Sequence, residues 1–204
     1  TYPSDPSGIA AVWYKIGSPP TSSADGMRIS VNNIQSLSNL VVPSEGEIPI
    51  YIWLEDGEGN KDHNNRGQIT LRYDGTAPVS GTISINGGTS SVNSLIVTLN
   101  NLGASDLSGL SQMRFSNQSG GPWSSPESCV STRGGWNLSQ YGGNTNLGQK
   151  TVYAQFMDGA GNWSKSVSAT IFLDTTPPTA PTNLSGSALA TNAVLLQWGA
   201  SSDN

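Results

Sequence analysis

Two parts of the chain repeat one another about one hundred residues apart, and this repeat constrains the fold more than any other feature. DPSGIAAVWYKI at 5–16 resembles DLSGLSQMRF at 106–115, and IYIWLEDGEGN at 50–60 resembles VYAQFMDGAGN at 152–162. A third match joins LRYDGTAP at 71–78 to IFLDTTPP at 171–178. Near-constant offsets over three separate blocks predict a duplicated domain.

Each repeat has the pattern of short β-strands. Successive strand side chains point to opposite faces, so Ile50, Ile52 and Leu54 are predicted to face a core, with Tyr51 and Trp53 outward. The same alternation recurs over 152–157. Many short strands between Gly, Pro and Asn turns, without a helical period, predict an all-β fold of β-sandwiches.

The ends of the repeats resemble known modules. YAQFMDGAGNWS followed by ATIFLDTTPP resembles the end of bacterial immunoglobulin-like repeats in long surface proteins. DTTPPTAPTNLSGSALATNAVLLQWGASSDN is similar to the start of a bacterial fibronectin type III module, in which Trp198 would be a core residue. The resemblance implies tandem immunoglobulin-like β-sandwiches over 1–77 and 78–176 and the opening strands of a fibronectin type III-like module over 177–204. It also implies a spacer, adhesion or accessory role in an extracellular or cell-surface protein.

The two repeats differ in their opening strands. The second repeat has GTISI (81–85) and SLIVTLN (94–100) before its DLSG block, whereas the first has no such strands before DPSG. Residues 179–204 supply strands of this kind with nothing after them. The first sandwich is therefore expected to lack its opening strands. Three interpretations follow: an excerpt of a longer repeat protein, disordered ends, or head-to-tail strand complementation by Val194, Leu196 and Trp198 that builds a filament from adjacent copies.

The amino-acid composition limits which kinds of binding partner and which cellular location are expected for the chain. A net charge of −5 argues against nucleic acid, which requires clustered Lys and Arg. No segment approaches the roughly 20 apolar residues of a membrane span. Charged residues make up only 11% of the chain, which is typical of secreted β proteins rich in hydroxyls and amides. Cys129 is the sole cysteine, so no disulfide forms within the chain, and this favours a bacterial source.

DGEGN and DGAGN are predicted to be hairpin turns, in which Asp and Asn side chains bond nearby backbone. The alternative is calcium, which takes six to eight oxygen ligands. The candidate ligands are Asp56, Asn60, Asp62, Asp158 and Asn162. No other cofactor is expected.

An outward aromatic patch is predicted from Trp13, Tyr51 and Trp53. It would stack on sugar rings if exposed, and the alternative function is therefore a carbohydrate-binding accessory module that recognises surface glycans. The competing interpretation is that segment 31–45 folds over the patch. His63 is the only histidine, and the sequence contains no G-x-S-x-G motif that would place a nucleophilic serine beside it. No enzyme activity is therefore expected.

Overall fold

The structure, a computed structural model, describes residues 7–203. The structure is all-β, which confirms the fold class expected from the sequence. Among residues 7–203, the one helical element is the 3₁₀ turn η1 (Asn86–Gly88). Within residues 7–203, no helix has the length and apolar character needed to cross a membrane. The chain divides into two compact units, Thr1–Thr76 with Ala160–Asn162, and Ala77–Gly159 with Trp163–Asn204.

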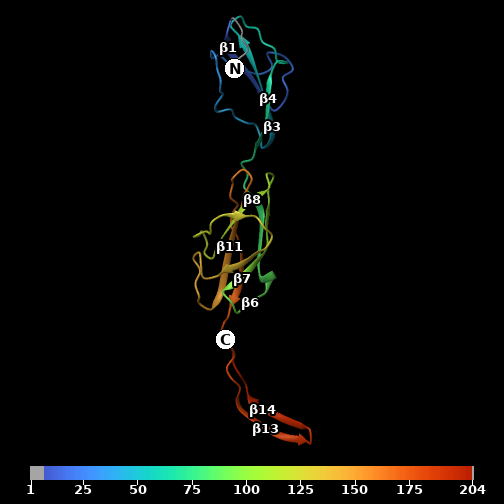
Figure 1. The fold of residues 1–204 in the computed structure, drawn as a ribbon, viewed down its shortest axis with the longest axis vertical. Helices are drawn as coiled ribbons and strands as arrows, with labels where there is room; N and C mark the ends of the chain where they lie inside the picture. Colours follow the sequence, from blue (N-terminus) through green and yellow to red (C-terminus); the bar gives the residue numbers. More distant parts are fainter. Residues whose placement is uncertain (1–6, 204) are drawn as a thin grey trace. The chain divides into compact units, whose positions relative to one another are not determined.

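The first unit contains one antiparallel sheet in the order β2-β1-β3-β4 (Figure 1). Its strands are β1 (Ile9–Ile16), β2 (Met27–Ile29), β3 (Gly46–Asp56) and β4 (Gly67–Tyr73). Trp13 pairs with Trp53 between β1 and β3, and Ile50 pairs with Ile69 between β3 and β4. Among the described residues of this unit there is no second sheet, so it forms one layer of a sandwich.

The strand register gives this sheet two faces of different chemistry. The first, called the apolar face below, consists of Val12, Tyr14, Ile16, Ile48, Ile50, Ile52, Leu54, Ile69, Leu71 and Tyr73. The second, called the aromatic face, consists of Ala11, Trp13, Lys15, Tyr51, Trp53 and Glu55.

The aromatic face is covered, so the prediction that Tyr51 and Trp53 point outward to solvent is wrong. Trp53 is 1% exposed and Tyr51 5%. Of the three residues predicted as core, Ile50 is buried at 5% exposure, whereas Ile52 and Leu54 are only partly buried. The loop before β2 covers the indole of Trp53. Its Nε1 donates to the Ser23 carbonyl at 3.1 Å, and a Cβ added to Gly26 would meet the same ring at 2.5 Å.

Segment 31–45 lies against the apolar face, so the prediction that it covers the aromatic patch is also wrong. Ile34 and Leu37 line a cavity of about 120 Å³ together with Val12, Ile52 and Leu54. Gln35 and Ser36 of the segment also line this cavity, whose other lining residues are aliphatic.

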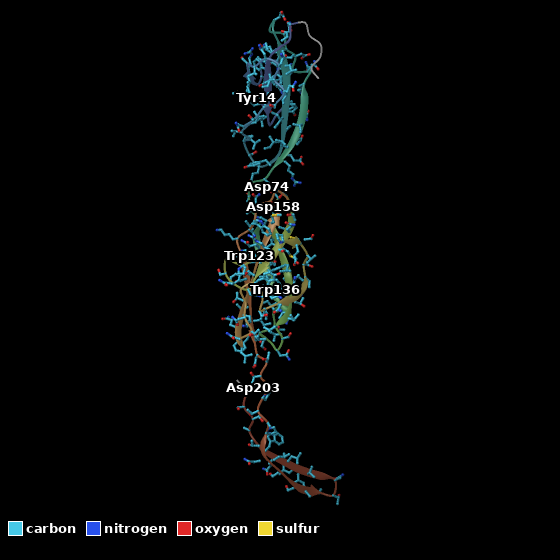
Figure 2. All side chains as sticks on the ribbon, turned by 60° about the vertical axis from the view of Figure 1, so that its left-hand side comes forward. Tyr14, Asp74, Trp123, Trp136, Asp158 and Asp203 are labelled. Atoms are coloured by element: carbon cyan, nitrogen blue, oxygen red, sulfur yellow. The ribbon has the colours of Figure 1, made fainter. Side chains whose placement is uncertain are left out.

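The second unit contains a complete sandwich of two sheets, ordered β10-β7-β5 and β6-β12-β11-β8-β9. The strands are β5 (Val79–Ile85), β6 (Ser91–Val92), β7 (Ile96–Ser105), β8 (Leu110–Ser116), β9 (Glu127–Ser128), β10 (Arg133–Asn137), β11 (Gly148–Asp158) and β12 (Val167–Leu173). Leu99 of the first sheet and Phe115 of the second are both 0% exposed within one continuous core. Trp136 lies inside this sandwich, where its Nε1 donates to Asn117 Oδ1 at 2.8 Å (Figure 2).

Residues after the sandwich form a two-stranded antiparallel hairpin, β13 (Thr182–Ala190) and β14 (Ala193–Gly199). Every residue of these strands is exposed except Gly199, which is half-buried. Val194 is 69% exposed, Leu196 54% and Trp198 60%. The expectation that Trp198 is a core residue is wrong, because among the described residues no second layer packs on the hairpin.

Candidate functional site

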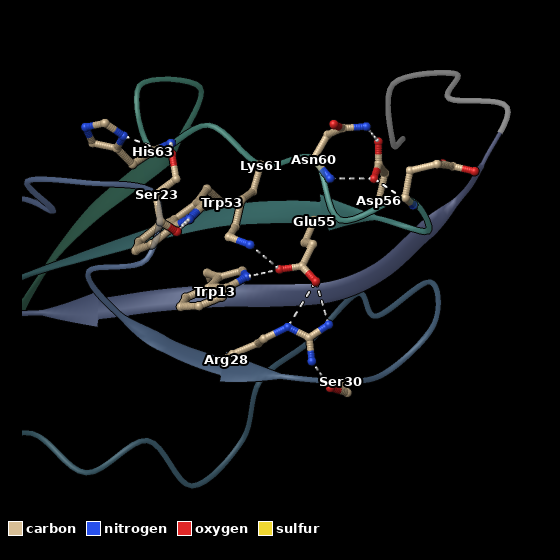
Figure 3. Close-up of polar contacts among 11 residues, drawn as sticks. Trp13, Ser23, Arg28, Ser30, Trp53, Glu55, Asp56, Asn60, Lys61 and His63 are labelled. Carbon is tan, nitrogen blue, oxygen red and sulfur yellow. Dashed lines mark hydrogen bonds and ion pairs between the residues drawn. The ribbon is translucent and has the colours of Figure 1, made fainter.

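Glu55 is the centre of a polar cluster on the aromatic face (Figure 3). Its side chain is only 8% exposed. Oε1 accepts from Arg28 Nε at 3.1 Å and from Arg28 Nη2 at 2.6 Å. Oε2 accepts from Trp13 Nε1 at 2.7 Å and from Lys61 Nζ at 3.0 Å. Four donors from three side chains therefore hold one buried carboxylate.

Strand pairing brings these partners together. Trp13 of β1 pairs with Arg28 of β2, and Glu55 forms a β-bridge with Lys61 after the DGEGN turn. The hydrogen bonds from Arg28 lower the pKa of Glu55 from 4.5 to about 2 against the opposing effect of burial, and Trp13 and Lys61 contribute in the same direction. Glu55 is therefore an anion at neutral pH and a poor proton donor.

The predicted ligand-binding residues are brought together, but they do not form an open platform. The rings of Trp13 and Trp53 stack with centroids 6.1 Å apart and an interplanar angle of 17°. Lys61 Nζ lies 5.0 Å from the centroid of Trp13, and the Arg66 guanidinium 5.4 Å from that of Tyr51. The aromatic surfaces are thus occupied by each other and by cations of this chain.

The second unit carries a related cluster that the sequence analysis did not single out. Arg114 lies over the rings of Trp123 and Trp163, with distances of 5.0 Å and 4.2 Å to the centroids. Its Nε and Nη2 donate to Gln155 Oε1 at 2.9 and 2.7 Å. Gln155 in turn donates to the Ser164 carbonyl at 2.9 Å. Arg114 and Gln155 occupy the places that Trp13 and Trp53 hold in the first repeat, but Trp123 and Trp163 come from loops.

Glu55, Arg28 and Lys61 were absent from the residues that the sequence singled out. A signal was available for Glu55, because it follows Trp53 by two residues and so lies on the same face of β3. Arg28 gave no such signal, since its partner is 27 positions away in the chain.

In the first unit, the candidate calcium ligands are used as turn acceptors. Asp56 Oδ1 accepts from the backbone of Glu58 at 3.0 Å and of Asn60 at 2.8 Å, and Oδ2 accepts from Asn60 Nδ2 at 2.7 Å. These hydrogen bonds lower the pKa of Asp56, and the bond from the Asn60 side chain has the largest effect. Asp62 Oδ1 accepts from Asn64 N at 2.9 Å. This is the geometry of Asx turns, in which the chain itself supplies the donors.

The two remaining candidate ligands lie in different units. Asp158 ends β11 in the second unit and is 1% exposed, and an oxygen of its carboxylate lies within 4.8 Å of one of Asp106. Asn162 belongs to the segment that groups with the first unit, where its side-chain amide donates to the Asp74 carbonyl at 3.2 Å.

The side chain of His63 is partly buried, with 21% of its surface exposed. Its Nδ1 lies 3.2 Å from Ser23 Oγ (Figure 3). The same nitrogen lies 3.8 Å from Asp62 Oδ1. A Ser-His-Asp relay needs the serine on one ring nitrogen and the carboxylate on the other. Here both approach the same nitrogen, and Ser23 Oγ also accepts from His63 N at 3.2 Å. This geometry does not activate the hydroxyl.

A groove of about 710 Å³ opens where β3 extends beyond the start of β4. Ile9, Ile52 and Leu54 supply its apolar wall, and the loop that contains Asn60 and Lys61 supplies its polar rim. The groove is therefore continuous with the apolar face of the first unit.

Comparison with known proteins gives a limited result. No family model matches the chain, and no curated protein does. Among solved structures, the fibronectin(III)-like modules of Clostridium thermocellum CbhA are similar over 84% of this chain and 82% of that chain, with 14% sequence identity and a TM-score of 0.37. The assignment to the all-β class rests on the strands and sheets described above.

Proposed function

We propose that the chain is a non-enzymatic structural or adhesive repeat region of a secreted or cell-surface bacterial protein. The observation that carries this proposal is that the titratable side chains on and beside the aromatic face, Glu55 and His63, form hydrogen bonds with other residues of the chain. Glu55 is held by Arg28, Trp13 and Lys61, while His63 bonds Ser23 in a geometry unsuited to catalysis. Bonds of this kind rigidify a module, and they leave Glu55 and His63 poorly suited to act as acid or base on a substrate.

The repeat supports the same role. Two related β-sheet units follow one another with short DGTAP and DTTPP segments after their last strands. Proline fixes φ and restricts the preceding residue, so such segments are semi-rigid spacers. The role also predicts contacts with copies of the chain or with neighbouring repeats of a longer one.

The test combines activity, glycan binding and mechanics. We expect no turnover on a panel of chromogenic glycoside, ester and peptide substrates, no retention on immobilised polysaccharides, and a discrete unfolding event of the second sandwich when the chain is pulled by its ends. Turnover of any substrate would contradict the proposal. Retention on a polysaccharide that is lost in Trp13→Ala would instead support the carbohydrate-binding accessory module.

A further inference from the structure

We infer that a polar cavity in the second unit binds a small hydroxy acid, with the carboxylate of the acid beside Lys150. The cavity has a volume of about 180 Å³ and lies between the first residues of β11 and the loops that follow β8 and β10. The inference goes beyond the proposed function, because it names a ligand rather than a mechanical role. Three observations carry it: a buried cation without a counter-ion, polar side chains without partners, and a loop wall of fixed shape.

Lys150 places a cation at the wall of this cavity. On β11 it has the inward phase of Val152 and Ala154, both 0% exposed, and it is itself only 7% exposed. Its Nζ donates to the Asn144 carbonyl at 3.0 Å and to Asn144 Oδ1 at 2.6 Å. Both acceptors are neutral, and no carboxylate within residues 7–203 forms an ion pair with the ammonium. An ammonium has three N–H donors, so one of them is left for a ligand.

The fold itself does not require a lysine at this position. Val152 corresponds to Ile50 in the sequence repeat, so Lys150 corresponds to Ile48. Ile48 is 3% exposed and occupies the equivalent place with an aliphatic side chain. A buried cation without a counter-ion is less stable than an apolar side chain of similar size, and burial lowers the pKa of Lys150 accordingly. A residue that weakens the fold in this way is typical of a binding site.

The other polar side chains at the cavity contrast with those around Glu55. Amides and hydroxyls that line the cavity belong to Gln118, Ser119, Gln149, Thr151 and Tyr153. In the part of the chain that the structure describes, none of these amide or hydroxyl groups forms a hydrogen bond with another residue. Glu55, by contrast, accepts hydrogen bonds from three side chains. Because amides and hydroxyls both donate and accept hydrogen bonds, the groups at the cavity suit a ligand that carries hydroxyls.

Hydrogen bonds and a glycine fix the loop wall of the cavity. Asn117 Nδ2 donates to the Gln140 carbonyl at 2.7 Å, and Gly143 N donates to the same carbonyl at 2.9 Å. Gly142 has a φ of +85°, and a Cβ added to it would meet Gln118 Cβ at 2.6 Å. The wall therefore has its shape before a ligand arrives, which reduces the conformational entropy lost on binding.

The charge and the size of the cavity define the class of ligand. Lys150 is the one cation among the described residues that line it, and no Asp or Glu is among them. This single positive charge matches the single negative charge of a carboxylate, whereas a sulfate dianion would keep an uncompensated negative charge. The volume is below the roughly 300–1,000 Å³ of sites for drug-sized ligands, so the ligand is about the size of one sugar ring. A sugar acid such as glucuronate combines these properties.

The test is an NMR titration of the full chain with D-glucuronate, D-glucose and sulfate. Glucose has a similar ring without the carboxylate, and sulfate has negative charge without the hydroxyls. We expect saturable shifts of the Gln149 and Gly143 amide resonances with glucuronate at millimolar concentration. Glucose and sulfate should bind at least about tenfold more weakly. The methyl glycoside of glucuronate distinguishes two sources of the same group, because equal binding indicates the end of a glycan and lost binding indicates the free acid.

Two lysine variants test the role of the cation. Lys150→Met should abolish the shifts, whereas Lys165→Met removes an exposed lysine outside the cavity and should leave them unchanged. The Trp136 indole N–H resonance, hydrogen-bonded to Asn117, verifies that the second unit is folded. If Lys150→Met does not fold, Thr151→Val tests the same site by removing one hydroxyl, and it should weaken glucuronate binding by a factor of about 2–10.

The inference is overturned if glucuronate causes no saturable shifts, or if glucose or sulfate binds as tightly as glucuronate. It is also overturned if a folded Lys150→Met binds like the original chain, or if Lys165→Met loses binding as well. The proposed function is tested separately by turnover, by the effect of Trp13→Ala on polysaccharide retention, and by unfolding under force. A failure of either idea is therefore distinguishable from a failure of the other.

Discussion

Replacing Glu55 by glutamine is expected to weaken the first unit at neutral pH and to have little effect near pH 2. The carboxylate has an unfolded pKa of 4.5 and a folded pKa of about 2. A group whose pKa falls on folding stabilises the folded state above its unfolded pKa, and this contribution disappears as the pH falls through the folded pKa. A shift from 4.5 to about 2 corresponds to at most about 3 kcal/mol. Since the Arg28 side chain is 39% exposed, solvent screening reduces the expected loss to about 1–2 kcal/mol.

The indole of Trp13 provides a direct readout of this ionisation. Its Nε1 donates to Glu55 Oε2 at 2.7 Å, so its N–H resonance should move when the carboxylate is protonated. The Trp53 indole donates to the Ser23 carbonyl and serves as an internal control. We expect the Trp13 resonance to titrate with a midpoint near pH 2 in the original chain and to show no such step in Glu55→Gln.

The stability measurement needs a matched substitution. Glu58→Gln removes an exposed carboxylate from the neighbouring turn and should leave the free energy of unfolding nearly unchanged. Hydrogen exchange of β1 and β3 amides reads the first unit separately from the second. A Trp13 midpoint close to 4.5, or equal losses of stability for Glu55→Gln at pH 7 and pH 2, would refute the electrostatic reasoning.

Three further outcomes are expected. In a calcium titration followed by NMR, the amide resonances around Asp56 should not shift, because its carboxylate oxygens already accept turn hydrogen bonds. Shifts are expected near Asp158, where two carboxylates lie close together. Resonance shifts around Asp56 alone would reverse this assignment. Lys150 is 7% exposed, its Nζ donates a hydrogen bond to Asn144 Oδ1 at 2.6 Å, and burial lowers its pKa. Lys150→Met should therefore preserve the melting temperature of the second unit in calorimetry or raise it by a few degrees. A large drop in melting temperature would contradict this prediction. Burial raises the pKa of the Cys129 thiol, so its reaction with a disulfide reagent at mildly alkaline pH should be slower than that of free cysteine, and a rate equal to free cysteine would show that the thiol is open to solvent.

The turns and strands could be predicted from the sequence because their determinants are local. Asp56 bonds the backbone of Glu58 two residues later, so DGEGN encodes its own turn. The two-residue alternation placed β3 and β11, and the repeat between them identified corresponding positions in the two units. The same comparison predicted that the first sandwich lacks its opening strands, and the described part of the first unit contains a single sheet.

Which side chains of the second half of β3 are buried could not be predicted in the same way. Alternation separates Tyr51 and Trp53 from Ile52 and Leu54, but both sets are apolar, and the pattern does not say which one becomes covered. Loops distant in sequence decide this, since Ser23 accepts from Trp53 across 30 positions and Arg28 reaches Glu55 across 27. The Arg114 stack likewise required Trp123 and Trp163 to meet from separate loops.

By itself, the sequence determined the class of fold, the repeat and the hairpin turns, because hydrogen bonds between near neighbours and side-chain periodicity encode them. The tertiary structure decided which side of each strand was shielded from water, that Glu55 became a buried anion, and that Leu71 and Trp198 remained exposed. Those outcomes depend on surfaces that meet only after the chain has folded, and no local pattern records them.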